Sequence, residues 1–387
     1  MKQPYVPLDK KSKKQQKEYH SKQRREWGNV NPVTKKLESA KVYSRKKSKQ
    51  GWHAYDSGLD FFIRLAAVLL IFVFVLQNTS VSVNARQSFR EIPISIGEYG
   101  LDGLLLRPRG GVPPVAILIH GSGQTDMNSN LGGVELFRDI AHGLGEAGIA
   151  SVRFNKRFYQ HPPIPLDMTI HSEVLEDVSY AVHWAYNNTA LGDIYLVGFS
   201  LGGILAPTIA HQHDGMIAGI VSMAGSPRPF SEIFVSQSDM LSYMSARTFS
   251  LYLPTGLPVG HMLNLFLSAD PELLSEMYHL NSWARWLGFP IPYLLSLREI
   301  CTRSVIDDLH VRKLILHGSE DLQLFAAHDF VAWQELLVYR DNATFILYDG
   351  LNHFFTPHVP ELGYWQTVQR SRVDARVIED IARWINE

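Results

Sequence analysis

The sequence predicts an α/β domain whose central sheet is mostly parallel and doubly wound. Three observations predict it. Short apolar runs rich in Val and Ile recur through residues 91–387 without polar alternation, which is typical of strands buried on both faces. Helical patterns of apolar residues lie between these runs. The connecting loops are short, and strand–helix alternation with short loops favours a parallel sheet covered by helices on both faces.

The expected elements follow in chain order. Alternating apolar and polar positions around Tyr99-Gly100 predict a β-hairpin of residues 91–96 and 101–107. Compact apolar runs then predict buried strands at residues 115–120, 148–154, 193–199, 216–225, 313–318 and 344–350. The helical patterns fall at residues 134–148, 171–188, 201–213, 328–339 and 371–387.

One interval, about 226–308, interrupts this rhythm. It has no obvious strand, is rich in large apolar residues and is predicted as several short helices. A long insertion in a compact domain is usually functional, so we interpret it as a helical cap over the site. The alternative is a set of helices docked as ordinary core.

The amino-terminal segment differs from the rest of the chain in its charge. Residues 1–57 carry 16 Lys/Arg against 5 Asp/Glu, whereas residues 58–387 carry 21 against 33. With few aliphatic residues, the segment is predicted to be a disordered basic cytoplasmic tail. It either sets membrane topology, or binds anionic lipid headgroups or nucleic acid.

Residues 58–78 contain an apolar segment that we interpret as a single-pass membrane anchor. Its charge-free core, residues 65–76, is shorter than a comfortable span, but Arg64 can extend its side chain to the headgroups. A cleaved signal ending near Ala85 is the alternative. The positive-inside rule places the basic tail in the cytoplasm, so both interpretations export the body, with 79–90 as a linker.

The candidate nucleophile is Ser200 in the stretch DIYLVGFSLGGILAPTIA. An apolar strand precedes this serine and a helical pattern follows it, which is the context of a nucleophile elbow. Gly198 and Gly202 leave room for close backbone approach. Gly-x-Ser-x-Gly alone is a modest signal, so the serine needs partners elsewhere.

Those partners are predicted from the two strands that follow. The first ends in HGSEDLQ and delivers Asp321, and the second ends in DGLNHFF and delivers His353. The order Ser, acid, His is that of the elbow arrangement. We prefer Asp321 to Glu320 because its shorter side chain holds an imidazole more rigidly, and Asp349 is a further alternative.

Two backbone N–H groups are predicted to bind the oxyanion. One is that of Leu201, directly after the serine, and the other is that of Ser122 in HGSGQTD, with Gly123 close behind. The later stretch RFNKRFYQH (153–161) either lines the pocket with its cations or is a structural loop held by charge pairs.

The set HGSGQTD, RFNKRFYQH, VGFSLGG, HGSEDLQ and DGLNHFF resembles the α/β-hydrolase superfamily over residues 90–387. More narrowly, it is similar to bacterial hydrolases of the serine aminopeptidase-like and dienelactone-hydrolase-like esterase groups. The resemblance implies an α/β-hydrolase fold, a Ser200–Asp321–His353 triad and hydrolysis of an ester. It leaves the substrate open, because the cap varies among relatives.

We therefore expect a serine hydrolase that cleaves a carboxylic ester of a small to medium, partly apolar substrate outside the cytoplasm. A peptidase, amidase or acyltransferase on the same triad, or a non-catalytic binding module, is the alternative. The expected substrate-binding residues are Gly121, Gly123, Phe199, Trp283 and Trp286. No cofactor, no metal and no nucleic-acid partner of the catalytic domain is expected. The single cysteine, Cys301, is expected to be a packing residue.

Overall fold

The structure is a computed structural model of the 387-residue chain. It describes residues 12–14, 16, 88–131, 133–245, 290–359 and 371–387. The chain divides into two units, Met1–Ser82 and Val83–Glu387, and only residues 12–14 and 16 of the first unit are described. The predicted anchor and nearly all of the predicted basic tail lie outside the described residues. Within the described ranges, every helix is too short or too polar to span a bilayer.

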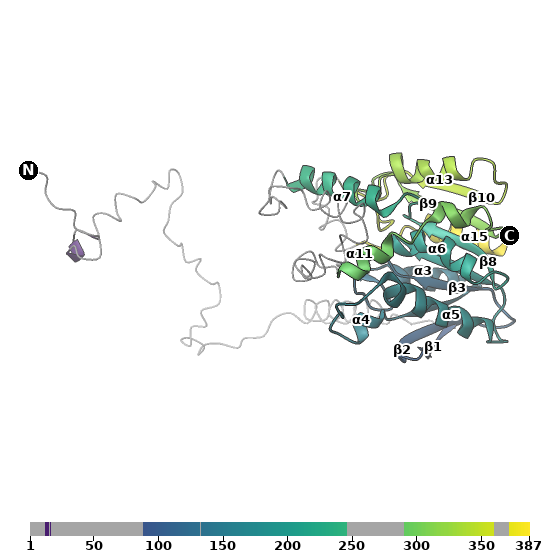
Figure 1. Cartoon of the computed structure of the whole chain (residues 1–387). Coiled ribbons are helices and arrows are strands. Elements are labelled where there is room, and N and C mark those ends of the chain that lie inside the picture. Colours follow the sequence, from purple (N-terminus) through teal and green to yellow (C-terminus); the bar gives the residue numbers. More distant parts are fainter. Residues whose placement is uncertain (1–11, 15, 17–87, 132, 246–289, 360–370) are drawn as a thin grey trace, which may run out of the picture. The chain divides into compact units, whose positions relative to one another are not determined.

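Eight strands form one sheet in the order β1-β2-β6-β3-β7-β8-β9-β10 (Figure 1). Their bounds are β1 (Phe89–Ile96), β2 (Leu101–Pro108), β3 (Val115–Ile119), β6 (Ala150–Phe154), β7 (Ile194–Phe199), β8 (Ile217–Met223), β9 (Arg312–Gly318) and β10 (Ala343–Tyr348). The pairs β1–β2 and β2–β6 are antiparallel, and the other neighbouring pairs are parallel. The predicted hairpin and the predicted strands are confirmed, but β10, at the edge of the sheet, is only partly buried. A small second hairpin, β4 (Asn130–Leu131) with β5 (Val134–Glu135), was not predicted.

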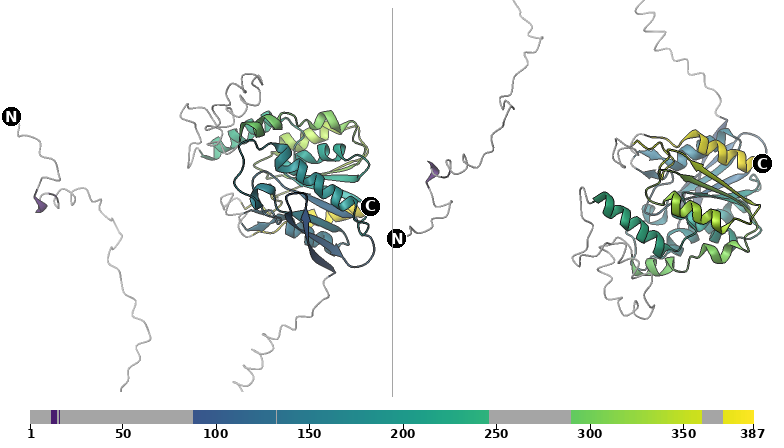
Figure 2. Two further views of the ribbon diagram at one scale, coloured as in Figure 1. Left: turned by 60° about the horizontal axis from the view of Figure 1, so that its bottom comes forward. Right: turned by 90° about the horizontal axis from the view of Figure 1, so that it is seen from above.

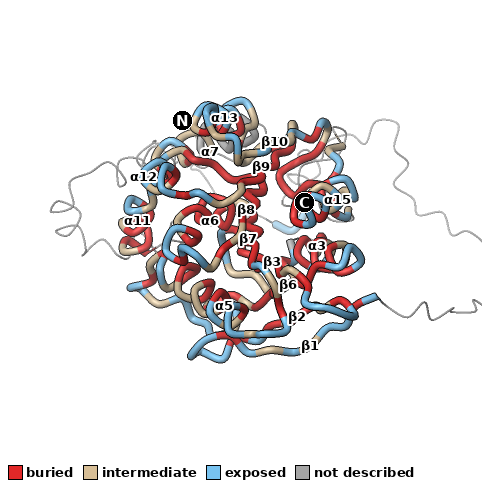
Figure 3. Tube along the Cα trace, turned by 90° about the vertical axis from the view of Figure 1, so that its right-hand side faces the viewer, coloured by how far each residue is buried: buried red, intermediate tan, exposed pale blue. Residues whose placement is uncertain are grey.

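Helices cover both faces of the sheet (Figures 2 and 3). α3 (Leu136–Glu146) and α15 (Ala375–Asn386) contribute to one apolar cluster. The other cluster receives α5 (Glu176–Tyr186), α6 (Leu201–Gln212) and Trp333 of α13 (Val331–Leu336). The mostly parallel, doubly wound α/β architecture is therefore confirmed.

Strand β3 explains why the buried strands show no polar alternation. Its side chains point alternately to the two faces, so Ile117 joins one apolar cluster and Leu118 joins the other. All five of its residues are buried. A strand with helices on both sides has no solvent face, so every position along it is apolar.

Two helices begin with a wider π-helical turn that the sequence did not predict. η2 (His171–Leu175) leads into α5, and η4 (Ala326–Phe330) leads into α13. A single π-turn spaces its apolar residues much as an α-helical turn does. The sequence pattern therefore predicts a helix but does not distinguish the two kinds of turn.

The interval predicted as a cap contains three described helices. They are α7 (Phe230–Ser245), α11 (Ile291–Leu297) and α12 (Thr302–Ile306), and α7 and α11 lie beside one end of the sheet (Figures 1 and 2). Residues 246–289, which include Trp283 and Trp286, lie outside the described residues. The expectation for Cys301 is wrong, because this residue immediately precedes α12 and is exposed.

Candidate active site

Ser200 occupies a sharp turn between β7 and α6. Its backbone has φ 53° and ψ −116°, a conformation that residues other than glycine rarely adopt. Neighbouring backbone holds it there, since Ser200 N donates to the Met223 carbonyl at 2.8 Å and Ser200 O accepts from Ile204 N at 3.0 Å. The turn therefore lifts the hydroxyl above the carboxyl end of the sheet.

The two flanking glycines are required by close backbone approach. A Cβ on Gly198 would overlap the carbonyl of Gly202, and a Cβ on Gly202 would overlap the carbonyl of Ile119. The Gly-x-Ser-x-Gly pattern thus reflects packing of the turn against β3 and against itself.

His353 contacts both the serine and the acid. Its Nε2 lies 3.1 Å from Ser200 Oγ, and its Nδ1 lies 2.7 Å from Asp321 Oδ2. An ionised carboxylate can only accept, so Nδ1 carries the proton and Nε2 accepts from the hydroxyl. The imidazole is buried and packs against Phe199, with ring centroids 5.0 Å apart.

The environment of Asp321 keeps its carboxyl group ionised. Burial by itself would raise its pKa, but the charge and hydrogen bond of His353, the charge of His317 and the N–H of Leu324 together hold the pKa below its usual value. Oδ1 accepts from Gln323 N at 2.8 Å and from Leu324 N at 2.9 Å.

Backbone hydrogen bonds link the loop that carries Asp321 to the loop that carries His353. Glu320 N donates to Leu351 O, and Ser319 N donates to Tyr348 O, both at 2.9 Å. A Cβ on Gly318 would overlap the carbonyl of Leu351, so this position needs glycine. The separation of Asp321 and His353 is therefore set by two adjoining strand ends.

The loop after β3 reaches the same edge of the sheet. Its His120 is fully buried, with Nε2 at 2.7 Å from Phe154 O and Nδ1 at 3.0 Å from Thr125 Oγ1. Burial, followed by the charge of Lys156, lowers the pKa of His120 to about 3. The ring is therefore neutral near pH 7, donating from Nε2 and accepting at Nδ1.

Beside Ser200 lies a small, mostly apolar pocket of about 40 Å³. It lies between the elbow, the loop after β3 and the helices α7 and α11. Its described lining comprises Ser122, Ser200, Leu201, Ile204, Phe230, Ile233, Phe234, Gln237, Tyr293, Leu297 and Leu324. The two predicted oxyanion donors thus share one pocket with the predicted nucleophile.

Known proteins resemble this chain in sequence and in fold. The alpha/beta hydrolase fold family matches residues 114–251. Esterase EstD of Thermotoga maritima is 31% identical over 300 residues, covering 77% of this chain and 68% of that protein. The chain belongs to the α/β-hydrolase family.

Solved structures of lower sequence identity were also found. Est1E of Butyrivibrio proteoclasticus is 17% identical, with a TM-score of 0.48 over 76% of this chain and 99% of that one. The Pyrococcus furiosus esterase Pf2001 is 16% identical, with a TM-score of 0.45 over 77% of this chain and 92% of that one. The relationship to EstD makes this α/β hydrolase carboxylesterase-like.

The other predicted site residues of the hydrolase have varied positions. Glu320 and Asp349, the alternative acids, are exposed, whereas Asp321 contacts the imidazole. Phe199 is buried against His353, and neither it nor Gly121 and Gly123 belongs to the described lining of the pocket. Trp283 and Trp286 lie outside the described residues.

The cations of the RFNKRFYQH stretch are held by carboxylates. Arg153 Nη2 lies 2.6 Å from Glu91 and Lys156 Nζ lies 2.7 Å from Glu173, while Arg157 pairs with Asp177. These three cations are buried and lie outside the described pocket lining. Of the two interpretations, the structural loop held by charge pairs fits the contacts.

Sequence reasoning missed two residues that support the site. His317 Nε2 lies 2.7 Å from Leu324 O, and the amide of Asn352 holds the His353 loop through Thr356 and Phe354 N. A signal for His317 was present, because a His-Gly pair lies at the carboxyl end of a strand at both His120 and His317. Each of these rings bonds a backbone carbonyl of a neighbouring segment.

Proposed function

We propose that the protein is a serine carboxylesterase in which Ser200, His353 and Asp321 form a catalytic triad. The observation that carries the proposal is the position of one imidazole, 3.1 Å from the serine hydroxyl and 2.7 Å from a buried carboxylate. A base that contacts the nucleophile and is itself oriented by an acid is the arrangement that activates serine.

In the first half-reaction, Ser200 Oγ attacks the acyl carbon while Nε2 of His353 takes its proton. The carbonyl π electrons move to oxygen, where the N–H groups of Ser122 and Leu201 bind the oxyanion. Leu201 N belongs to the first turn of α6, whose N–H groups have no intrahelical acceptor. The tetrahedral species collapses, and the departing alcohol takes the proton from His353.

Water completes the reaction. His353 removes a proton from a water molecule as its oxygen attacks the acyl carbon of the acyl-enzyme. Collapse of the second tetrahedral species releases the carboxylic acid and returns the proton to Ser200. Asp321 keeps the imidazole in the required tautomer and stabilises its charged form, while remaining ionised itself.

The substrate is proposed to be a partly apolar ester. Support comes from the pocket lining, which is dominated by aliphatic and aromatic side chains such as Ile204, Phe230 and Leu297. The relative EstD bears the name esterase, which supports the same reaction class.

Fluorophosphonate labelling tests the triad. Wild type should be labelled and should hydrolyse p-nitrophenyl esters, whereas Ser200→Ala should not be labelled and should lose about 10⁴-fold or more in kcat. Ser304→Ala is the matched control, because Ser304 is an exposed serine on α12. Equal labelling of wild type and Ser200→Ala contradicts the assignment, and faster turnover of aminoacyl amides or amine acceptors favours a peptidase or acyltransferase.

We propose further that this hydrolase works outside the cytoplasm. The excess of Lys/Arg in residues 1–57 before the apolar segment of 58–78 supports export. Protease added to spheroplasts, in which the cytoplasmic membrane is the only barrier, should digest the hydrolase domain, and its protection contradicts export. The mass of the mature protein separates the alternatives, since loss of about 85 residues means a cleaved signal.

A further inference from the structure

The loop that carries Ser122 is held by three consecutive residues at the end of the neighbouring strand β6, namely Phe154, Asn155 and Lys156. Phe154 O accepts from the His120 ring at 2.7 Å, and Asn155 Oδ1 accepts from Met127 N at 2.8 Å. Lys156 N donates to Thr125 O at 3.3 Å. These contacts fix both ends of the loop at residues 120–127.

The side chain of Lys156 fixes the middle of that loop. Its Nζ, on a side chain only 2% exposed, donates to the Gly121 carbonyl at 3.0 Å and to Glu173 Oε1 at 2.7 Å. Burying an ammonium group is costly unless it is paired and hydrogen-bonded. Of its two acceptors, Glu173 balances the charge and Gly121 O belongs to the loop beside Ser200.

Gly121 O and Ser122 N belong to the same peptide group. A trans peptide is planar, so its C=O and N–H point in opposite directions. When Lys156 holds the carbonyl oxygen, it also sets the direction of the Ser122 N–H. The peptide is adjacent to the nucleophile, because a Cβ on Gly121 would lie 3.3 Å from Ser200 Cβ.

Glu173 connects this ammonium to the pocket wall. It accepts from Gln124 Nε2 at 3.4 Å, and its charge acts on Tyr293, a residue of α11 that lines the pocket. Burial, followed by the charge of Glu173, raises the pKa of Tyr293 well above its usual value, so its hydroxyl stays protonated. Glu173 Oε1 thus accepts from both Gln124 and Lys156, which fixes this oxygen beside the ammonium group.

We propose that Lys156 is a positioning residue of the oxyanion site, which aims the Ser122 N–H through the Gly121–Ser122 peptide. The inference rests on the proposed function. Without Nζ, the peptide can rotate and the N–H no longer points at the oxyanion. Substrate binding in the ground state changes little, because the donor acts on charge that develops later.

The test distinguishes two roles of Lys156, namely positioning of the Gly121–Ser122 peptide and balancing of the Glu173 charge. Lys156→Met leaves Glu173 buried and unpaired, and it is expected to lose stability. In Lys156→Met/Glu173→Gln both charges are absent, and the fold should recover as judged by thermal unfolding. Glu173→Gln alone leaves the Lys156 ammonium buried without its counter-charge, so this single variant is also expected to lose stability.

For the double variant we expect kcat on p-nitrophenyl esters to fall about 10- to 100-fold, with KM changed less than about threefold. Affinity for an alkyl trifluoromethyl ketone, which forms a tetrahedral oxyanion adduct with serine, should fall by the same factor as kcat. The matched control is Arg157→Met/Asp177→Asn, a neighbouring buried ion pair that does not contact the Gly121–Ser122 peptide. Its kcat should stay within about twofold of wild type.

Wild-type kcat and ketone affinity in the folded double variant would overturn the inference, since Lys156 would then serve only to balance Glu173. An equal fall in the control pair would also overturn it, because any buried pair would then have the same effect. If wild type neither hydrolyses esters nor reacts with fluorophosphonate, the proposed function falls and the inference falls with it.

Discussion

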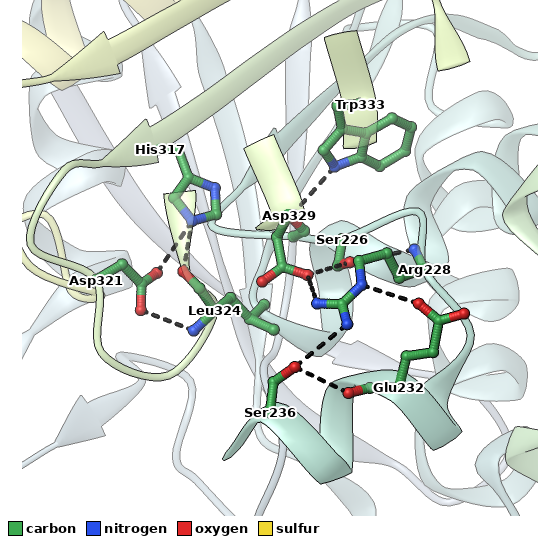
Figure 4. Close-up of polar contacts among 10 residues, drawn as sticks. Ser226, Arg228, Glu232, Ser236, His317, Asp321, Leu324, Asp329 and Trp333 are labelled. Carbon is green, nitrogen blue, oxygen red and sulfur yellow. Dashed lines mark hydrogen bonds and ion pairs between the residues drawn. The ribbon is translucent and has the colours of Figure 1, made fainter. Parts of the chain in front are cut away.

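The imidazole of His317 donates a hydrogen bond of 2.7 Å to the carbonyl oxygen of Leu324 (Figure 4). The same nitrogen lies 3.5 Å from Asp321 Oδ2, and Asp321 Oδ1 accepts from Leu324 N at 2.9 Å. Leu324 is therefore held through its N–H by the carboxylate and through its carbonyl by the imidazole. The turn that carries Asp321 is therefore stabilised by two hydrogen bonds at Leu324.

We predict that His317→Leu loosens this turn. The Leu324 carbonyl would be left buried and unpaired, which costs about 1–3 kcal/mol in the free energy of unfolding. Less precise placement of Asp321 should lower kcat about tenfold with little change in KM. Urea unfolding and ester hydrolysis measure the two effects. His328→Gln, at an exposed histidine of η4, is the control, and equal losses in both variants would contradict a specific role for His317.

Much of the fold and part of the site could be predicted from sequence, for one physical reason. The strands of the sheet are mostly apolar runs, so their ends are easily located, and the carboxyl ends of parallel strands share one edge. Ser200, Asp321 and His353 each follow such an end, and the structure brings them together. The exposure of Glu320 agrees with the preference for Asp321.

The supporting residues could not be predicted in the same way. His317 and Lys156 bond to backbone carbonyls, which every residue has, and only the folded chain brings Leu324 and Gly121 into reach. The cations of RFNKRFYQH left two interpretations open for this reason, since charge alone does not show whether a side chain faces a pocket or a buried carboxylate.

We predict that Gly202→Ala abolishes the folded elbow. A Cβ at this position would overlap the backbone carbonyl of Ile119, which belongs to the central strand β3 and cannot move without disrupting the sheet. The expected cost is about 3 kcal/mol or more, seen as loss of soluble protein or a lower Tm. Gly215→Ala is the control, because this glycine has φ +78° but open space around it. Its cost should be about 1 kcal/mol, and a Gly202→Ala variant as stable as this control would refute the packing argument.

We predict that His120 destabilises the protein as the pH falls. The folded ring, with a pKa of about 3, stays neutral, while the unfolded ring takes a proton below about pH 6.5. A pKa lowered by folding thus costs stability as the pH falls from about 6.5 to about 3, by about 1.4 kcal/mol per pH unit. Relative to His120→Gln, wild type should lose about 2 kcal/mol between about pH 7 and about pH 5.

Urea unfolding of both proteins at the two pH values measures this difference. Groups shared by wild type and His120→Gln cancel in the comparison. The exposed His328 provides the control, since His328→Gln should follow wild type at both pH values. Parallel curves for wild type and His120→Gln would show that the ring is protonated in the folded state as well.

Arg228 connects the first helix of the predicted cap interval to the core (Figure 4). Its guanidinium donates to the buried Asp329 at 3.2 Å, and to Glu232 and Ser236 of α7 at 3.1 and 3.2 Å. Asp329 also accepts from Ser226 at 2.6 Å. One side chain thus fixes the start of α7 against η4.

We predict that Arg228→Met affects substrate binding more than chemistry. Phe230, Ile233 and Phe234 line the pocket from α7, so a loosened helix presents a less ordered apolar wall to the substrate. KM for p-nitrophenyl esters should rise about five- to tenfold, with kcat within about threefold of wild type.

The rate of labelling by a small fluorophosphonate should stay unchanged. None of the described hydrogen bonds or ion pairs joins Ser200 or His353 to Arg228 or Asp329. Arg303→Met, an exposed arginine of α12, should leave KM unchanged. A fall in kcat at constant KM would instead mean that Arg228 acts on the triad, through the segment that joins Asp329 to Asp321.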